Sequence, residues 1–153
     1  MTRNPARIAP SVANAVMPTD WNGWHSCARL IGYVMQSLAE FRSESDFETL
    51  KPAAVMVESF LRDGIGSDPH TDDPWLVVLL AKQALSAARL RYAETYEWSL
   101  TYAETDALQR MVRLYTTQLF GSSPDQVLAA AARAPRALVP AWATALLRDA
   151  KAA

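Results

Sequence analysis

The feature that most limits the fold of this chain is a run, residues 75–120, that contains neither glycine nor proline. Apolar side chains recur through it at intervals of three and four residues, the spacing of one face of an α-helix. They are Leu85, Ala88, Tyr92, Tyr96, Leu100, Ala103, Ala107, Met111 and Leu114. One straight helix over this run would be about 70 Å long, roughly twice the width of a domain of this size. We therefore expect two helices in this run.

A break in this run is predicted between Trp98 and Thr101. Thr101 is followed three residues later by Glu104, which is the spacing of a capping box, where each side chain bonds to the backbone of the other residue. Ser99 adds a weak helix former at the same place. In the alternative, an unbroken helix, Trp98 and Tyr102 would lie one turn apart on an exposed face. Paired exposed aromatic side chains are typical interface anchors.

Two helices are predicted before this run. The first is capped by Thr19 or Asp20, and the second by Ser45, which has the capping-box spacing to Glu48. The apolar stripe of the first helix is Trp24, Cys27, Ile31, Val34, Leu38 and Phe41. Pro52 lies too deep in the second helix for a first-turn proline, so a kink or a new helix start is expected there.

The next boundaries are marked by glycine, proline and capping residues. Gly64 and Gly66 are expected to end the second helix. Asp73 is expected to cap a third, with Pro74 at its first position, where the missing N–H costs nothing. Residues 75–81 are apolar on every side, so we expect the first two turns of this helix to be surrounded by the others.

The remaining chain is divided in the same way. Gly121 ends one helix, and Ser123 begins the next with the capping-box spacing to Gln126. Pro135 and Pro140 separate this short helix from a last one. The last helix carries Trp142, Leu146 and Leu147.

The predicted fold class is all-α. Residues 1–18 contain three prolines and are expected to form an extended N-terminal arm. Residues 19–153 are expected to form a single-domain bundle of five or six helices. No segment shows the alternation and turn dipeptides of β-strands.

Composition places the chain among globular proteins, since half of its 153 residues are hydrophobic and a fifth are charged. The single cysteine, Cys27, cannot form an internal disulfide, and the start of the chain has no apolar stretch typical of a signal peptide. The longest strongly apolar run, residues 75–81, is far shorter than the roughly 20 residues of a membrane span. We predict a cytoplasmic protein without a membrane segment.

No catalytic or metal-binding signature is present. Neither histidine follows a glutamate at the Glu-x-x-His spacing of di-metal helical bundles. His25 and Cys27 are two residues apart, which points them to different sides of a helix. The loop with Asp68, His70 and Asp72 lacks the pattern of a calcium site, and helix capping explains its aspartates. We therefore predict no enzymatic activity, no metal and no cofactor.

Charge is distributed unevenly along the chain. Residues 40–73 hold nine carboxylates and three basic side chains, whereas residues 107–153 hold six basic side chains and two carboxylates. The candidate contacts to an anionic partner or a nucleic-acid backbone are Arg110, Arg113, Arg133 and Arg136. The alternative is that the two regions form ion pairs with each other inside the fold.

Aromatic residues supply the candidate protein interfaces, which are Trp21, Trp24, Trp98 and Tyr102. Together these features predict a non-enzymatic helical interaction or assembly protein, a subunit or adaptor in a larger complex, acting through a protein partner or self-association. One alternative is a small helical subunit that binds the nucleic-acid backbone in a ribonucleoprotein complex, comparable to CRISPR small subunits in size and helical class alone. Another is a phage- or plasmid-encoded inhibitor that binds a host protein.

Overall fold

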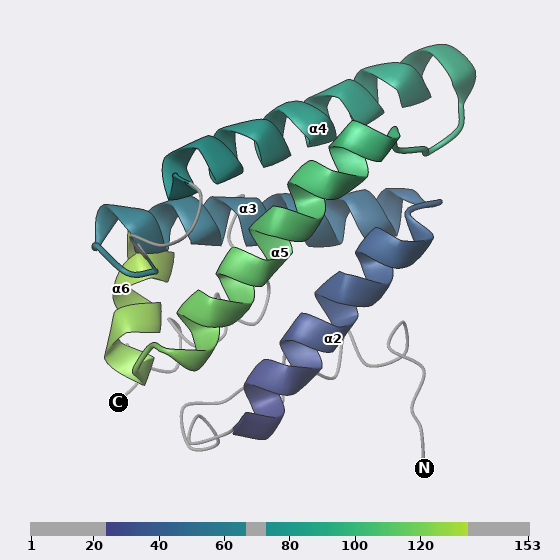
Figure 1. Cartoon of the computed structure of the whole chain (residues 1–153). Helices are drawn as coiled ribbons and strands as arrows, with labels where there is room; N and C mark the ends of the chain where they lie inside the picture. Colours follow the sequence, from purple (N-terminus) through teal and green to yellow (C-terminus); the bar gives the residue numbers. More distant parts are fainter. Residues whose placement is uncertain (1–23, 67–72, 135–153) are drawn as a thin grey trace.

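The computed structural model describes residues 24–66 and 73–134, and every regular element in these two ranges is an α-helix. The helices, labelled as in Figure 1, are α2 (Trp24–Glu40), α3 (Glu44–Arg62), α4 (Pro74–Thr95), α5 (Tyr102–Phe120) and α6 (Pro124–Arg133). The predicted all-α class is confirmed for this part of the chain. The predicted arm, residues 1–18, and the predicted last helix lie outside the described residues.

Helix α3 lies at the centre of the described bundle and packs against each of the other four helices. Figure 1 shows α5 crossing in front of it, with α4 on one side, α2 on the other and α6 at one end. Its buried side chains extend around most of its circumference. They are Phe47, Leu50, Ala53, Ala54, Met56, Val57, Ser59, Phe60 and Leu61.

The prediction that the other helices surround the first two turns of α4 is wrong. Among the described helices, α4 makes its main contacts with α3 and α5, and its buried side chains lie on the side toward them. Its outward side chains in these turns, among them Leu76 and Leu79, are about half exposed. An apolar sequence shows which side chains can be buried, but it does not show how many neighbours the fold supplies.

The start of α3 differs from the prediction by two residues. Its N-cap is Ser43, whose hydroxyl accepts a hydrogen bond from the backbone N–H of Asp46 at 3.2 Å. The carboxylate of Asp46 in turn accepts from the backbone N–H of Arg42 at 3.0 Å. The predicted capping box of Ser45 and Glu48 is therefore wrong, because the earlier start satisfies two backbone donors and places two acidic residues in the first turn.

Helix α3 continues through Pro52 to Arg62, so the alternative of a new helix beginning at Pro52 is wrong. The predicted end of the helix is confirmed. Gly64 has a φ of 75°, and its N–H donates to the carbonyl of Leu61 at 2.9 Å. This left-handed conformation after the last turn is one that glycine adopts without steric cost.

The predicted break in the run 75–120 is confirmed. Helix α4 ends at Thr95, and Tyr96 adopts a left-handed conformation with a φ of 60°. Helix α5 begins after Thr101, and both bonds of the predicted capping box are present. The carboxylate of Glu104 accepts from the N–H of Thr101 at 2.9 Å, and the hydroxyl of Thr101 accepts from the N–H of Glu104 at 3.2 Å.

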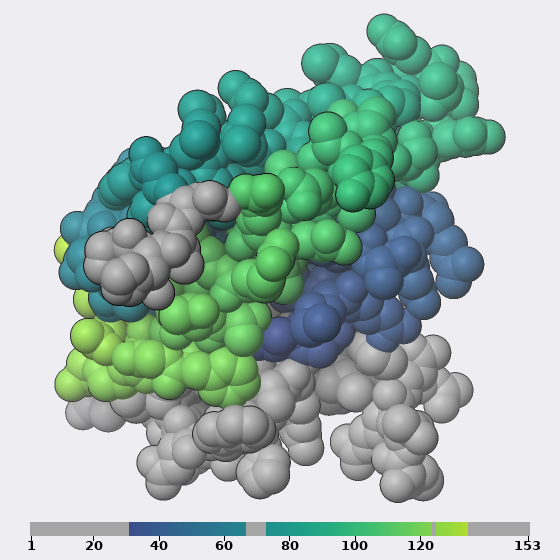
Figure 2. Space-filling view, in the orientation of Figure 1, coloured from purple at the N-terminus to yellow at the C-terminus, as the bar shows by residue number. Residues whose placement is uncertain are grey.

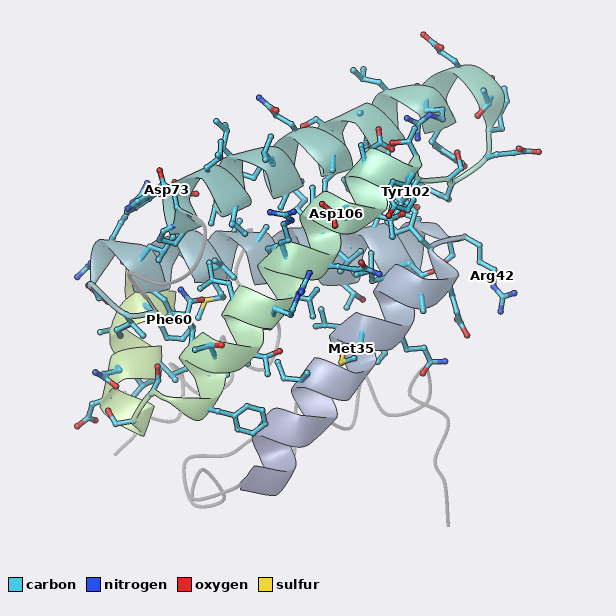
Figure 3. All side chains as sticks on the ribbon, viewed as in Figure 1. Met35, Arg42, Phe60, Asp73, Tyr102 and Asp106 are labelled. Carbon is cyan, nitrogen blue, oxygen red and sulfur yellow. The ribbon has the colours of Figure 1, made fainter. Side chains whose placement is uncertain are left out.

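Trp98, in the turn between α4 and α5, is buried in an aromatic cluster. Its indole stacks on Tyr92 of α4 with a centroid distance of 4.3 Å and on Phe47 of α3 at 5.1 Å. Phe41, directly after α2, meets it edge-on at 6.0 Å. One side chain therefore joins the ends of three helices. Trp98 does not form an exposed pair with Tyr102, which projects from the start of α5 and is 91% exposed (Figure 3).

Arg91 fixes the same turn through polar contacts. Its two terminal nitrogens bind the two carboxylate oxygens of Glu104 at 3.0 and 2.8 Å, and one of them also donates to the carbonyl of Ser99 at 2.7 Å. The hydrogen bonds from Arg91 lower the pKa of the Glu104 carboxyl, against the opposing effect of burial. The same pair raises the pKa of Arg91. Glu104 thus serves both as a capping residue and as a partly buried ion-pair partner.

At the opposite end of the bundle, the buried Gln118 of α5 holds the loop that follows α3. Its side-chain amide donates to the carbonyls of Val57 and Ile65 at 3.2 and 3.1 Å. Gly66 lies directly against this side chain, since a Cβ there would come within 2.6 Å of the Gln118 Cγ. The hydroxyl of Ser59 donates to the carbonyl of Ala130 and so ties α6 to α3.

Trp98→Ala is expected to destabilise the protein by about 3–5 kcal/mol, because it leaves a cavity among three helix ends. Tyr102→Ala is the matched control, four residues away and exposed, and should change the free energy of unfolding by less than about 0.5 kcal/mol. Urea denaturation followed by circular dichroism measures both values. Equal effects of the two substitutions would contradict the burial of Trp98.

The pKa of Glu104 predicts a pH-dependent contribution to stability. A carboxyl whose pKa is lower in the folded state stabilises fully above its unfolded pKa, and this contribution is lost as the pH falls through the folded value. Glu104→Gln should therefore destabilise the protein at pH 7, and its difference from the wild type should shrink below about pH 4.5, the ordinary value for this group. Denaturation curves from pH 7 to 3 test this. Asp106→Asn, which removes an exposed carboxylate of the same helix, is the control. If the difference in unfolding free energy between Glu104→Gln and the wild type is the same at every pH, the linkage to the pKa of Glu104 is excluded.

Candidate functional site

The outward face of α4 carries large apolar side chains with no helix of the described residues packed on them. They are Trp75 (47% exposed), Leu76 (48%), Leu79 (51%), Leu80 (41%) and Leu90 (68%). We refer to these five residues as the α4 apolar face. Side chains of α4 project along the upper edge of the molecule in Figure 2.

The opposite face of the same helix fills the core. Its buried residues are Val77, Val78, Ala81, Ala84, Leu85 and Ala88, and they lie toward α3 and α5. Helix α4 is therefore apolar on two sides, of which the bundle covers one. An isolated exposed leucine is common on protein surfaces, but apolar side chains clustered on one helix face are typical of interaction sites.

The charged residues of α4 between Trp75 and Leu90 are Lys82 and Arg89, and no carboxylate occurs in this range. Lys82 forms an ion pair with Glu58 of α3. Arg89 approaches Glu44 of α3 at 3.7 Å, with both side chains more than half exposed. These two cations lie two turns apart and border the α4 apolar face on its α3 side.

A groove of about 520 Å³ lies between α3 and α4 on this side. Its apolar surface is formed by Phe47, Ala54, Val55, Leu85 and Leu90, and its basic side chains are Lys51, Lys82 and Arg89. No carboxylate lines it. Leu90 lines this groove, whereas the other four residues of the α4 apolar face do not. The groove and the apolar face therefore meet at Leu90, and the exposed Gln83 and Ser86 lie between Leu90 and the leucines at the start of α4.

A second groove of about 760 Å³ separates α2 from α5. Met35, which is 56% exposed and labelled in Figure 3, lines it together with Phe41 and Val112. Glu40 and Arg113 contribute one charge of each sign. The mixed lining gives this groove no preference for a charged ligand of one sign.

Two of the four arginines predicted to contact an anionic partner form ion pairs with carboxylates of this chain. Arg110 pairs with Asp106 of its own helix at 3.0 Å. Arg133 pairs with Asp63, the residue that ends α3, where a carboxylate faces the negative end of the helix dipole and an arginine compensates it. Arg113 forms no ion pair within the described ranges, and Arg136 lies outside them.

The predicted aromatic interface is also changed by the structure. Trp98 is buried and serves the core, whereas Tyr102 is exposed. Trp24 is the first residue of α2, and Trp21 lies outside the described residues. The exposed apolar residues of α4 were missed as site candidates. Their signal was present in the sequence, since α4 is apolar on every side near its start, but it was interpreted as burial.

Neither a metal-binding cluster nor a membrane-spanning helix occurs among the described residues. They contain no group of three or more histidine, cysteine, aspartate or glutamate side chains that could hold a metal ion. None of their helices has the length and apolar character needed to span a membrane. The bidentate pair of Arg91 and Glu104 is explained by its role in the α4–α5 turn.

No known protein family, curated protein or solved structure matches this chain. The function must therefore be argued from the surface itself. Within the described residues, the α4 apolar face together with the groove beside it is the strongest candidate, because exposed apolar area lies next to a groove whose charged lining residues are all basic.

Adjacent residues of α4 test which of its faces is covered. Val78 is 3% exposed and Leu79 is 51% exposed. Val78→Ala should destabilise the protein by about 2 kcal/mol, from two lost methyl groups and the cavity they leave. Leu79→Ala removes a side chain whose covered half contributes roughly 1 kcal/mol, so it should lower the free energy of unfolding by at most about 1 kcal/mol. Thermal or urea denaturation measures both values. A larger loss of stability for Leu79→Ala than for Val78→Ala would mean that α4 is rotated about its axis relative to this description.

Proposed function

We propose that this chain is a non-enzymatic interaction subunit that binds a protein partner on the α4 apolar face. The observation that supports the proposal is the set of five large apolar side chains left 41–68% exposed on one side of one helix. Leucine and tryptophan at such positions lose contact with water when a partner helix covers them. An amphipathic helix that binds through its apolar side is a common mode of peptide recognition.

The energy available from this face is modest. Covering the exposed half of a large apolar side chain contributes roughly 1 kcal/mol, so five such residues supply roughly 5 kcal/mol. Association costs an estimated 4–15 kcal/mol in lost motion and ordering. Apolar contact alone therefore gives weak binding at most, and a stable complex needs further contacts beside the α4 apolar face.

Nucleic-acid-backbone binding has less support as a function. A phosphate-tracking surface needs several free cations in register with the backbone. Of the four candidate arginines, Arg110 and Arg133 are engaged by Asp106 and Asp63. The sequence also allowed the basic third of the chain to pair with the acidic region, and among the described residues Arg133 forms such an ion pair with Asp63.

The proposal is tested by site-specific photocrosslinking in the native host. A photoreactive amino acid at position 79 should crosslink to a protein partner. The same amino acid at position 102 is the matched control, since Tyr102 is even more exposed but lies outside the α4 apolar face. The crosslinked protein should be retained by wild type and lost by Leu76→Gln with Leu79→Gln.

Two other outcomes have defined meanings. A crosslink between two copies of this chain would identify self-association as the function of the face, and sedimentation would then show a dimer lost in the double variant. Crosslinking from position 102 alone, or retention of the partner by the double variant, would contradict the proposal. Glutamine keeps the helix propensity close to that of leucine, so loss of folding does not explain a loss of binding.

A further inference from the structure

We infer that the partner segment is an acidic amphipathic helix, whose apolar side lies on the α4 apolar face and whose carboxylates bind Lys51, Lys82 and Arg89 in the groove between α3 and α4. This inference rests on the proposed function and specifies the chemistry of the partner. It is carried by the charge of the groove, which is independent of the exposed leucines.

The groove has an apolar floor and a basic rim. Lys51 and Arg89 both approach the ring of Phe47, at 5.9 and 5.7 Å from its centroid. Lys51 forms no ion pair with any described residue. The contact of Arg89 with Glu44 is long and exposed, so it contributes little and can be exchanged for a partner carboxylate.

The spacing of the cations fits a helix better than an extended peptide. Lys82 and Arg89 are seven residues apart on α4, which places them on the same side of the helix and roughly 10 Å apart along its axis. In a partner helix lying along α4, residues seven positions apart also fall on the same side and are separated by the same distance. Two carboxylates at this spacing on one flank of the partner can therefore contact both cations. Its apolar residues on the adjoining side then cover Leu79 and Leu90.

A second copy of this chain does not supply these carboxylates from α4. Between Trp75 and Leu90 this helix contains no acidic residue, so an α4–α4 pair would add no carboxylate to the α3 partners that Lys82 and Arg89 already have, Glu58 and Glu44. In an antiparallel pair centred near Gln83, Asp73 of one copy would face Glu94 of the other, and like charges destabilise such contacts.

The two terminal segments outside the described residues are also poor in carboxylates. Residues 1–23 carry one acidic side chain, Asp20, against two arginines. Residues 135–153 carry Asp149 against three basic side chains. Residues 67–72 are too few for an amphipathic helix. The chemistry of the groove therefore favours a different protein.

The inference is tested with synthetic helices of about 18 residues, a length at which an isolated helix can form. Each carries leucines in a heptad pattern and, on one flank, two positions seven residues apart that hold glutamate, glutamine or lysine. Fluorescence anisotropy measures their binding to the full chain. The glutamate peptide should bind about tenfold more tightly than the glutamine peptide and more tightly still than the lysine peptide, with the advantage reduced at high salt.

Variants of the protein locate the effect. Lys51→Gln with Arg89→Gln should abolish the advantage of the glutamate peptide, whereas the control Arg113→Gln, on α5, should retain it. If charge makes no difference while Leu76→Gln with Leu79→Gln weakens all three peptides, the inference is overturned and the proposed function stands. If the leucine variant binds every peptide as the wild type does, both are overturned.

A small amphipathic anion is the main competing occupant. Dodecanoate has the apolar chain and the single carboxylate that could enter the groove without a protein partner. Its binding, lost in Lys51→Gln with Arg89→Gln and accompanied by no measurable binding of the glutamate peptide, would overturn the inference. Failure of the glutamate peptide to bind at all would do the same.

Discussion

The packing of Trp98 determines how the long central run of the sequence is divided. Stacked between Tyr92 and Phe47, its indole fixes the end of α4 against the start of α3, and Phe41 adds the end of α2. The chain cannot continue as a helix through this point and also bury the indole. It therefore turns, and α5 returns along α3 and α4.

This reversal explains why one face of α4 stays uncovered. Helices α3 and α5 together cover the side of α4 that carries Val77, Ala81 and Leu85. Helix α2 packs on α3 and α5 but makes no comparable contact with α4, and α6 lies against α3. No further helix of the described chain is placed where it could cover Leu76 and Leu79. The exposed face is thus a consequence of the topology, and the stability of the core does not depend on it.

Sequence reasoning succeeded where the controlling bonds are local. The capping boxes at Thr101 and Ser123 and the Asp73–Pro74 start each involve residues at most three apart, and all are present. Ser43 was missed in favour of Ser45 because both positions have suitable partners three residues later. The ion pairs of Lys82 with Glu58 and of Arg133 with Asp63 join residues far apart in the chain, so no spacing rule could indicate them.

The largest error was the predicted burial of the first turns of α4, and it too arose because contacts between distant parts of the chain cannot be deduced from local spacing. The same error indicates where a functional surface can be sought. Helical periodicity reports that a side chain is apolar, and it cannot distinguish contact with the rest of the chain from contact with another molecule. In α3 the exposed charged residues, Glu44, Glu48 and Arg62, lie on the side that faces water. Between Trp75 and Leu90 the corresponding side of α4 carries leucines, and the two charged residues of this range, Lys82 and Arg89, lie together on the α3 flank. A surface that is apolar in the middle and basic along one edge sets the orientation of a partner as well as its affinity, because only one flank of an incoming helix can carry the matching carboxylates.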